Sequence, residues 1–244
     1  MYVYRSANEL ALLLRHPLQK KVVGLEWKPK SEDVIAIACQ SSVIIWSIDT
    51  KLLANSRVPL NCARIIDKNL PSPVTSIAYN STGDTIAVCG PISWRIVLIP
   101  DDAGKEPIAV RHWFTGCWKL KWSPDGVRLL TYPSTTKIRM FENIAWSSAV
   151  WGTDFMSSYC QAACWSQPNG RFLLMAPNGS GTVYALTFLD KADANVVGGA
   201  NKLIKALDLD SLEPPNGESS VGGSVHDMRW DKHAERLVIS FKGM

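Results

Sequence analysis

Large apolar and aromatic residues recur along the chain in short runs that are separated by polar turns. Around residue 120, Trp118, Leu120 and Trp122 alternate with lysines, as a half-buried strand requires. Residues 34–37 and 172–175 are unbroken apolar runs, which are typical of a strand covered on both faces. No segment combines sustained helical periodicity with helix caps, so the pattern predicts an all-β fold.

One strand-and-turn motif occurs five times, at 25–33, 77–84, 120–126, 163–170 and 228–236. Each copy has a strand that ends in a large aromatic residue and is followed by turn chemistry such as Ser-Pro-Asp-Gly. Nineteen residues after each of the first four aromatics comes a second large side chain. We call these residues the repeat markers: Trp27, Trp46, Tyr79, Leu98, Trp122, Phe141, Trp165, Tyr184 and Trp230.

The first four aromatics are 52, 43 and 43 residues apart, and the fifth follows after 65. A period of about 40 to 45 residues with four short strands is typical of a WD40-type β-propeller blade. We therefore expect an incomplete propeller with about four whole blades and a partial blade at both ends. The expected ranges are the end of a preceding blade at 1–15, whole blades at 16–66, 67–111, 112–152 and 153–208, a loop at 209–224, and the start of a further blade at 225–244.

Composition narrows the class of protein. The chain has 244 residues, of which 46% are hydrophobic and 20% charged, so it has ample material for a core and is not a disordered chain. The net charge of +4 is mild and no long run of like charges occurs, which does not favour a nucleic-acid binder. The longest fully apolar stretch, Val34–Cys39, is far too short to span a bilayer. Six widely spaced cysteines indicate reduced thiols in an intracellular protein.

Sequence patterns for catalysis, cofactor binding and metal binding are missing. Cys160 and Cys164, with His112 or His226, lack the second close pair of a zinc site. The acidic pairs Asp101-Asp102 and Asp208/Asp210 lie in polar connections, where nothing desolvates a general acid. We therefore expect no enzyme, no cofactor and no metal.

Two kinds of residue are candidates for contacts with partners. The basic cluster Lys20, Lys21, Lys28 and Lys30 fits a solvated propeller rim better than a phosphate site, because a single indole lies near it. The marker aromatics are expected in the core. The tryptophans outside the markers are candidate exposed contacts: Trp113, Trp146 and Trp151. The segment 187–224 lengthens the last repeat and is either a partner-binding loop or disordered.

Several stretches carry a resemblance to a known family. The string HPLQKKVVGLEWKPKSEDVIAIACQSSVIIW (16–46), followed by GRFLL (170–174), VGGANK (197–202) and GGSVHDMRWD (222–231), resembles the aladin family of WD-repeat nucleoporins. That family implies a non-catalytic component of the nuclear pore complex, held at the nuclear envelope by a transmembrane nucleoporin and supporting nucleocytoplasmic transport. The WD40 pattern itself is loose, because the Gly-His dipeptide is missing and the Trp-Asp ending is degraded to Trp46-Ser47, Phe141-Glu142 and Tyr184-Ala185.

Two other functions remain open. A generic adaptor, such as a ubiquitin-ligase substrate receptor, is suggested by Trp230-Asp231-Lys232-His233, which lacks the arginine of the W-D-x-R element. A propeller hydrolase would need acidic residues and histidines that converge at one ring mouth, and the chain has four scattered histidines. We also expect the isolated chain to associate through unpaired strand edges, because of the half-blade at 225–244.

Overall fold

A computed structural model describes residues 1–4, 12–48, 57–111, 116–132, 135–151, 158–188, 203–210, 222–231, 233 and 235–242. The chain divides into two compact units, Met1–Leu120 and Lys121–Met244. The described residues are nearly all in strands and turns, with one short 3-10 helix, η2 (Leu60–Cys62). This confirms the all-β prediction. In the part of the chain that is described, no helix has the length and apolar character needed to cross a membrane.

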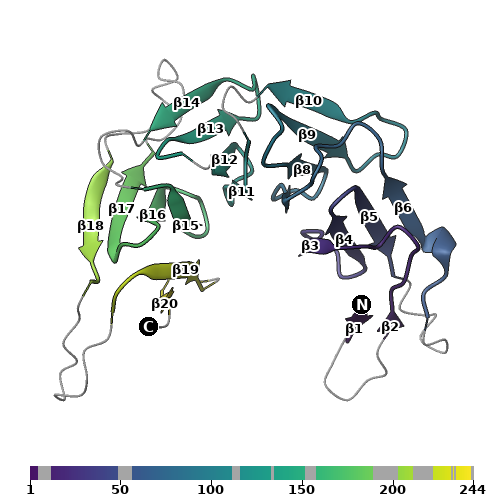
Figure 1. Cartoon of the computed structure of the whole chain (residues 1–244), viewed down its shortest axis with the longest axis horizontal. Coiled ribbons are helices and arrows are strands. Elements are labelled where there is room, and N and C mark those ends of the chain that lie inside the picture. The colour runs from purple at the N-terminus through teal and green to yellow at the C-terminus, as the bar shows by residue number, and fades with distance from the viewer. Residues whose placement is uncertain are drawn as a thin grey trace. The chain divides into compact units, whose positions relative to one another are not determined.

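The described residues of the first unit form one two-stranded sheet and two four-stranded sheets, all antiparallel (Figure 1). The strands are β1 (Tyr2–Val3) and β2 (Leu12–Leu13); β3 (Val22–Trp27), β4 (Val34–Cys39), β5 (Ser42–Ser47) and β6 (Ala63–Ile66); and β7 (Ser76–Tyr79), β8 (Thr85–Cys89), β9 (Arg95–Pro100) and β10 (Ile108–Arg111).

The second unit mirrors this content, with two four-stranded sheets and one two-stranded sheet. The strands are β11 (Lys119–Trp122), β12 (Arg128–Tyr132), β13 (Ile138–Glu142) and β14 (Ser148–Trp151); β15 (Cys160–Trp165), β16 (Phe172–Pro177), β17 (Thr182–Thr187) and β18 (Ile204–Asp208); and β19 (Val225–Trp230) and β20 (Leu237–Phe241). Each four-stranded sheet lies within one of the expected blade ranges. The exact blade boundaries stay a prediction.

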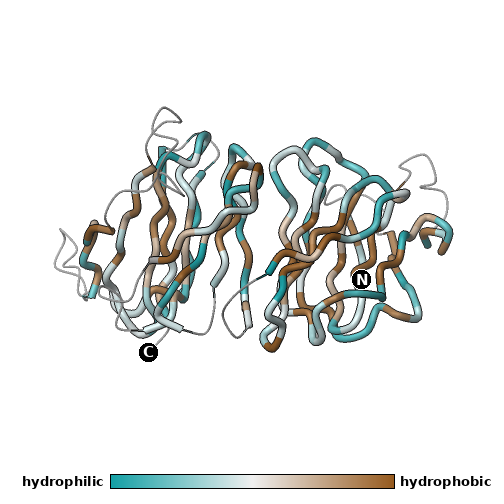
Figure 2. The backbone as a smooth tube through the Cα atoms, turned by 90° about the horizontal axis from the view of Figure 1, so that it is seen from above, coloured by the Kyte–Doolittle hydropathy of each residue, from teal (hydrophilic) through white to brown (hydrophobic). Residues whose placement is uncertain are grey.

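The sequence pattern explains how the sheets stack within each unit. In β4, Ile35 and Ile37 pack with β1–β2, whereas Ala36 and Ala38 pack with the sheet of β7–β10. In β16, Leu173 and Met175 face one cluster, and Leu174 and Ala176 face another. Both faces of these strands are therefore buried, which is why their apolar runs do not alternate. Within each unit, apolar residues follow the strands and polar residues gather in the turns (Figure 2).

The segment 187–224 contains a strand, β18, in its described part. Strand β18 lies within it and pairs with β17, with a register shift between Val183 and Tyr184. Residues 189–202 and 211–221 lie outside the described residues. The choice between partner binding and disorder for this segment stays open.

Candidate interaction surface and the contacts between sheets

Most repeat markers are buried, as expected of core residues. Trp46 and Phe141 are among the largest fully buried side chains, and Tyr79, Leu98, Trp122 and Trp165 are also buried. Tyr184 is half-buried against the cluster that contains Trp165, and Trp230 is half-buried against Phe172, with ring centroids 5.9 Å apart.

Trp27 departs from this expectation, because 44% of its surface is exposed. Its neighbours on β3, Val23 and Leu25, are exposed as well. The reason is the small size of the β1–β2 sheet, which covers β4 and β5 but leaves the β3 end of the same face open in the described part of the chain. The prediction that every marker aromatic is buried is therefore wrong at Trp27.

Neighbouring sheets contact each other through the residue that precedes a marker aromatic. Glu26 Oε2 on β3 accepts a hydrogen bond from the backbone N–H of Tyr79 on β7, at 2.9 Å. Burial raises the pKa of Glu26 to about 7, and the bond from Tyr79 opposes that rise. In the second unit, Lys121 Nζ on β11 donates to the backbone oxygen of Ala163 on β15, at 2.6 Å. The same motif position therefore joins inner strands in both units.

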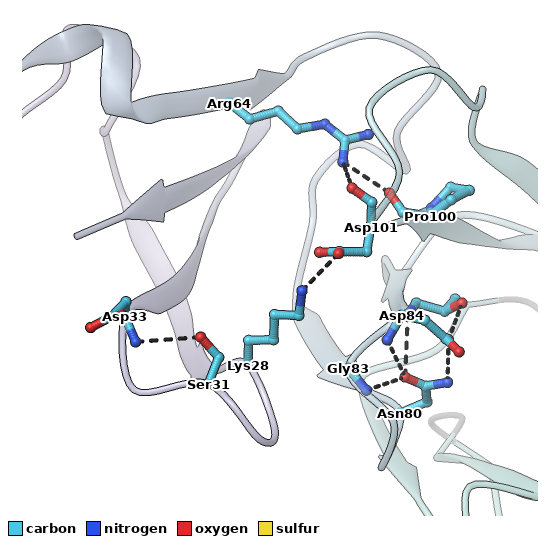
Figure 3. A network of polar contacts seen from close by, with 10 residues as sticks. Lys28, Ser31, Asp33, Arg64, Asn80, Gly83, Asp84, Pro100 and Asp101 are labelled. Carbon is cyan, nitrogen blue, oxygen red and sulfur yellow. Dashed lines mark hydrogen bonds and ion pairs between the residues drawn. The ribbon is translucent and has the colours of Figure 1, made fainter. Parts of the chain in front are cut away.

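An ion pair from Lys28 and hydrogen bonds from Arg64 join the first two four-stranded sheets at their rim (Figure 3). Lys28 Nζ lies 2.7 Å from Asp101 Oδ2, and Arg64 Nη1 donates to the backbone oxygens of Pro100 and Asp101 at 2.9 and 2.8 Å. Asp101 is thus a structural residue at this rim. Of the basic cluster, Lys28 is engaged in this ion pair, whereas Lys20, Lys21 and Lys30 are exposed.

The turns after the inner strands are stabilised by side chains. Asn80 Oδ1 accepts from the backbone N–H groups of Gly83, Asp84 and Thr85 (Figure 3). Such local bonds satisfy backbone donors that a tight turn leaves without ladder partners. Gly83, Gly126 and Gly170 have left-handed backbones in these turns, and in the turn after β3 a left-handed backbone occurs at Lys30, with a φ of 61°. A lysine there stores backbone strain that glycine would avoid.

Those residues considered for metal binding that the structure describes do not assemble into a site. No group of three potential metal ligands occurs among the described residues. Cys160 and Cys164 are buried thiols that donate to backbone oxygens, His226 is exposed, and His112 lies outside the described residues. All six cysteines are free thiols. Asp102 accepts from the Gly104 N–H in an exposed turn, and Asp208 pairs with Lys205 at 2.8 Å.

The exposed indoles are different from those expected. Trp113 and the side chain of Trp151 lie outside the described residues. Trp146 is half-buried and packs against Trp122 and Phe141, with ring centroids 6.1 and 6.3 Å apart. It is thus in large part a packing residue.

Trp94 and Trp118 are instead 59% and 51% exposed. Trp118, which the alternation with lysines places on the buried face of a strand, lies just before β11 and outside that strand.

Trp94 and Trp118 belong to loops that lie side by side in the first unit. The Cys117 N–H donates to the Gly90 oxygen at 3.0 Å, and a Cβ at Gly116 would overlap the Pro91 carbonyl. Arg111 lies over the Trp94 ring at 5.8 Å. Exposed tryptophan beside arginine is the composition of protein-binding hot spots. We call Ile92, Trp94, Arg111 and Trp118 the indole surface.

Comparisons with known proteins support the fold. No protein-family model matches the chain. Aladin from Arabidopsis thaliana is 23% identical over 253 residues, an alignment that covers 95% of this chain and 53% of the relative. The chain thus spans about half the length of this curated relative.

Among solved structures, the β-propeller domain of Cps50 (Swd1) from Myceliophteria thermophila matches with a TM-score of 0.60 at 12% identity, covering 94% of this chain and 64% of that chain. This likeness confirms the propeller prediction. The chain therefore has the fold of a WD-type β-propeller and is distantly similar to aladin along nearly all of its length.

Proposed function

We propose that the chain is a non-catalytic WD-repeat scaffold of the nuclear pore complex, located at the nuclear envelope and supporting nucleocytoplasmic transport. The observation that carries the proposal is the similarity to aladin, which extends over 95% of the chain. Its partners would be other nucleoporins, including a transmembrane one that anchors it. Rigid sheets that present variable loops suit such a role, because the loops can change while the packed core stays fixed.

The indole surface is the proposed docking site for such a partner. Trp94, Trp118 and Ile92 expose large apolar area on loops held together by backbone contacts, so little conformational entropy is lost when they bind. The Arg111 guanidinium beside Trp94 adds a donor for a carboxylate or a backbone carbonyl. The few residues that supply most of the binding energy in protein interfaces are enriched in tryptophan, tyrosine and arginine.

The alternative functions receive less support. Asp231 of the Trp-Asp element accepts hydrogen bonds from the N–H groups of Glu235 and Arg236. It therefore caps a turn in place of presenting a receptor contact. For a hydrolase, the described carboxylates would have to converge, but Asp101 and Asp102 serve a rim contact and an exposed turn.

Localisation in cells tests the proposal. The tagged chain is expected to give a punctate nuclear rim, and Trp94→Ala with Trp118→Ala is expected to weaken that signal at least fivefold. The matched control is Ile144→Ala, which removes an apolar side chain that is 84% exposed from the second unit. A diffuse signal for the unmodified chain would contradict the proposed location. A rim signal that survives both indole substitutions would contradict the docking role of the indole surface.

A further inference from the structure

The open face on β3 continues an interface that already exists. Trp27 pairs with Ile35, and Leu25 pairs with Ile37, so these four side chains share one face of the sheet. Ile35 and Ile37 are buried with Leu12 and Leu14, beside β1–β2, whereas Trp27 and Leu25 are 44% and 52% exposed. In the other unit, the equivalent face of β15 and β16 is covered along its whole width, because Ala163 and Trp165 are buried there.

The two short sheets are complementary in strand number. The β1–β2 sheet has two strands where the other sheets have four, and the β19–β20 sheet also has two. The sequence places the two sheets in different halves of a blade. Trp230 on β19 is a marker of the first strand of a blade, like Trp27 on β3, and Tyr2-Val3-Tyr4 at β1 resembles Ile44-Ile45-Trp46 on β5, the third strand of a blade. We propose that β19–β20 of one copy of this chain docks on β1 and β3 of a second copy, so that β19, β20, β1 and β2 form one four-stranded blade.

The free hydrogen-bonding edges agree with this arrangement. The Leu14 N–H bonds to the Met1 oxygen, so along β1 the pairing alternates and the backbone N–H of Tyr2 points away from β2. The Asp231 N–H bonds to the Arg236 oxygen, and by the same alternation the N–H groups of Leu237 and Ile239 point away from β19.

The register then follows from the first complete blade. There, β4 pairs with β5 as Ile35↔Trp46 and Ile37↔Ile44. The equivalent pairs between copies are Leu237 with Tyr4 and Ile239 with Tyr2. All four residues stand at outward-pointing positions of their strands, so both edges offer donors and acceptors at the same spacing.

The face of β19–β20 that would meet β3 has the composition seen at the other contacts between sheets. Arg229 and Val238 form a cross-strand pair on the face opposite the buried Met228, and both are exposed; Arg229 Nε also pairs with Asp227 Oδ2 at 3.2 Å. Arg229 precedes the marker Trp230, as Lys121 precedes Trp122. Lys121 donates to the oxygen of Ala163, two residues before the next marker. By this geometry Arg229 donates to the backbone oxygen of Leu25 in the second copy, and Val238 covers exposed apolar area near Leu25 and Trp27.

The inference is independent of the nuclear pore proposal. A head-to-tail contact leaves one free β3 face and one free β20 edge on every assembly that does not close on itself. Association should therefore grow with concentration. It should also depend on side chains at both ends of the chain.

Sedimentation velocity of the full chain tests the proposal. The unmodified chain is expected to associate at micromolar concentration. Two substitutions should each raise the dissociation constant at least tenfold: Leu25→Lys puts a charge on the open face of β3, and Val238→Lys puts one on the β19–β20 hairpin. Tyr2→Pro should do the same, since it removes the outward N–H without touching a bond between β1 and β2. Ile144→Lys, at an exposed apolar residue between β13 and β14 of the second unit, is the matched control and should have no effect.

Mixing two blocked chains distinguishes a head-to-tail contact from general stickiness. A Leu25→Lys chain keeps an intact hairpin, and a Val238→Lys chain keeps an intact β3 face. Each alone should be monomeric, and their mixture should form a one-to-one dimer that grows no further. A monomeric unmodified chain, single variants that associate like the unmodified chain, or a mixture that stays monomeric would each overturn the proposal.

Discussion

Trp165 and Trp27 occupy the same position of the same repeat motif, yet their surroundings are opposite. Trp165 is 4% exposed and packs among residues of the preceding sheet and against Phe188, whose ring centroid lies 5.3 Å away. Trp27 is 44% exposed. The motif decides where on a strand the indole stands. Whether the indole is buried depends on the next sheet, because a blade has two faces and cannot cover either of them alone.

The largest expected effect separates these two indoles. Trp165→Ala should lower the free energy of unfolding by about 3–5 kcal/mol, since it removes a buried ring and leaves a cavity. Trp27→Ala should lower it by about 1–2 kcal/mol, since 44% of the side chain's surface already stays in contact with water. Urea denaturation at a protein concentration that keeps the chain monomeric measures both. Equal losses would mean that the two sites do not differ in burial.

The next effect concerns Glu26, the carboxyl group that joins β3 to β7 in the first unit. The pKa of folded Glu26 is raised to about 7, above its usual 4.5, so the charged form is disfavoured by the fold. The free energy of unfolding therefore falls as the pH rises from about 4.5 to 7, because the unfolded chain loses this proton at a lower pH than the folded chain does. Glu26→Gln keeps an acceptor for the Tyr79 N–H and should stabilise the chain at pH 8 by about 1–3 kcal/mol, a range that allows for solvent screening of this half-buried group.

Thermal unfolding at pH 5 and pH 8 measures this effect. The gain from Glu26→Gln should shrink towards zero at the lower pH. Glu32→Gln, at an exposed carboxylate three residues beyond the turn proline, is the control and should behave like the unmodified chain at both pH values. A gain that is the same at both pH values would rule out titration of Glu26 as its cause.

The turns that follow the inner strands offer a smaller contrast. Lys30→Gly should stabilise the chain by about 0.5–1 kcal/mol, because glycine adopts the left-handed backbone without strain. Gly126→Ala should destabilise it by about 1 kcal/mol for the opposite reason, since its φ is 71°. Opposite signs in urea denaturation are the expected result. A loss at Lys30→Gly would show that this lysine makes a contact that outweighs its backbone strain.

The smallest expected effect is at the rim. Asp101→Asn removes the ion pair with Lys28, in which the side chains are 22% and 40% exposed, for lysine and aspartate respectively. The loss should be about 0.5 kcal/mol at low salt and should vanish at 1 M salt, because exposed ion pairs are weak and screened. The Arg64 contacts use backbone oxygens and should persist. A loss that does not respond to salt would point to packing in place of charge.

Local features of the sequence predict much of the fold. The apolar run of β4 follows from burial on both faces, and the Pro, Asp and Gly residues of 123–126 predict a turn, because both depend on neighbours along the chain. The nineteen-residue marker offset is met in the first sheet by Trp27 and Trp46, which both pair with Ile35. The repeat spacing alone therefore predicts which residues of β3 and β5 lie level with each other on the sheet.

The contacts that carry the candidate surfaces depend on residues far apart in sequence. Glu26 meets Tyr79 across 53 positions, and Gly116 meets Pro91 where two loops converge. No periodicity reports such contacts, so Glu26 was missed. Trp94 was not recognised as exposed, because an indole in a turn has no strand face from which burial can be inferred. The left-handed backbone at Lys30 was missed for a related reason, since Lys30 stands three residues after its marker, whereas the left-handed glycines stand four or five residues after theirs.

The tryptophans of this repeat stand at equivalent strand positions, and the neighbouring sheet determines how much of each indole is exposed to water. Hydroxyl-radical footprinting of the Val238→Lys chain, read out by mass spectrometry for each tryptophan, tests it most directly, because that variant leaves the β3 face uncovered. Trp27 is expected to be modified at least ten times faster than Trp46 and Trp165. Equal rates for the three, or fast modification of Trp46, would contradict the account.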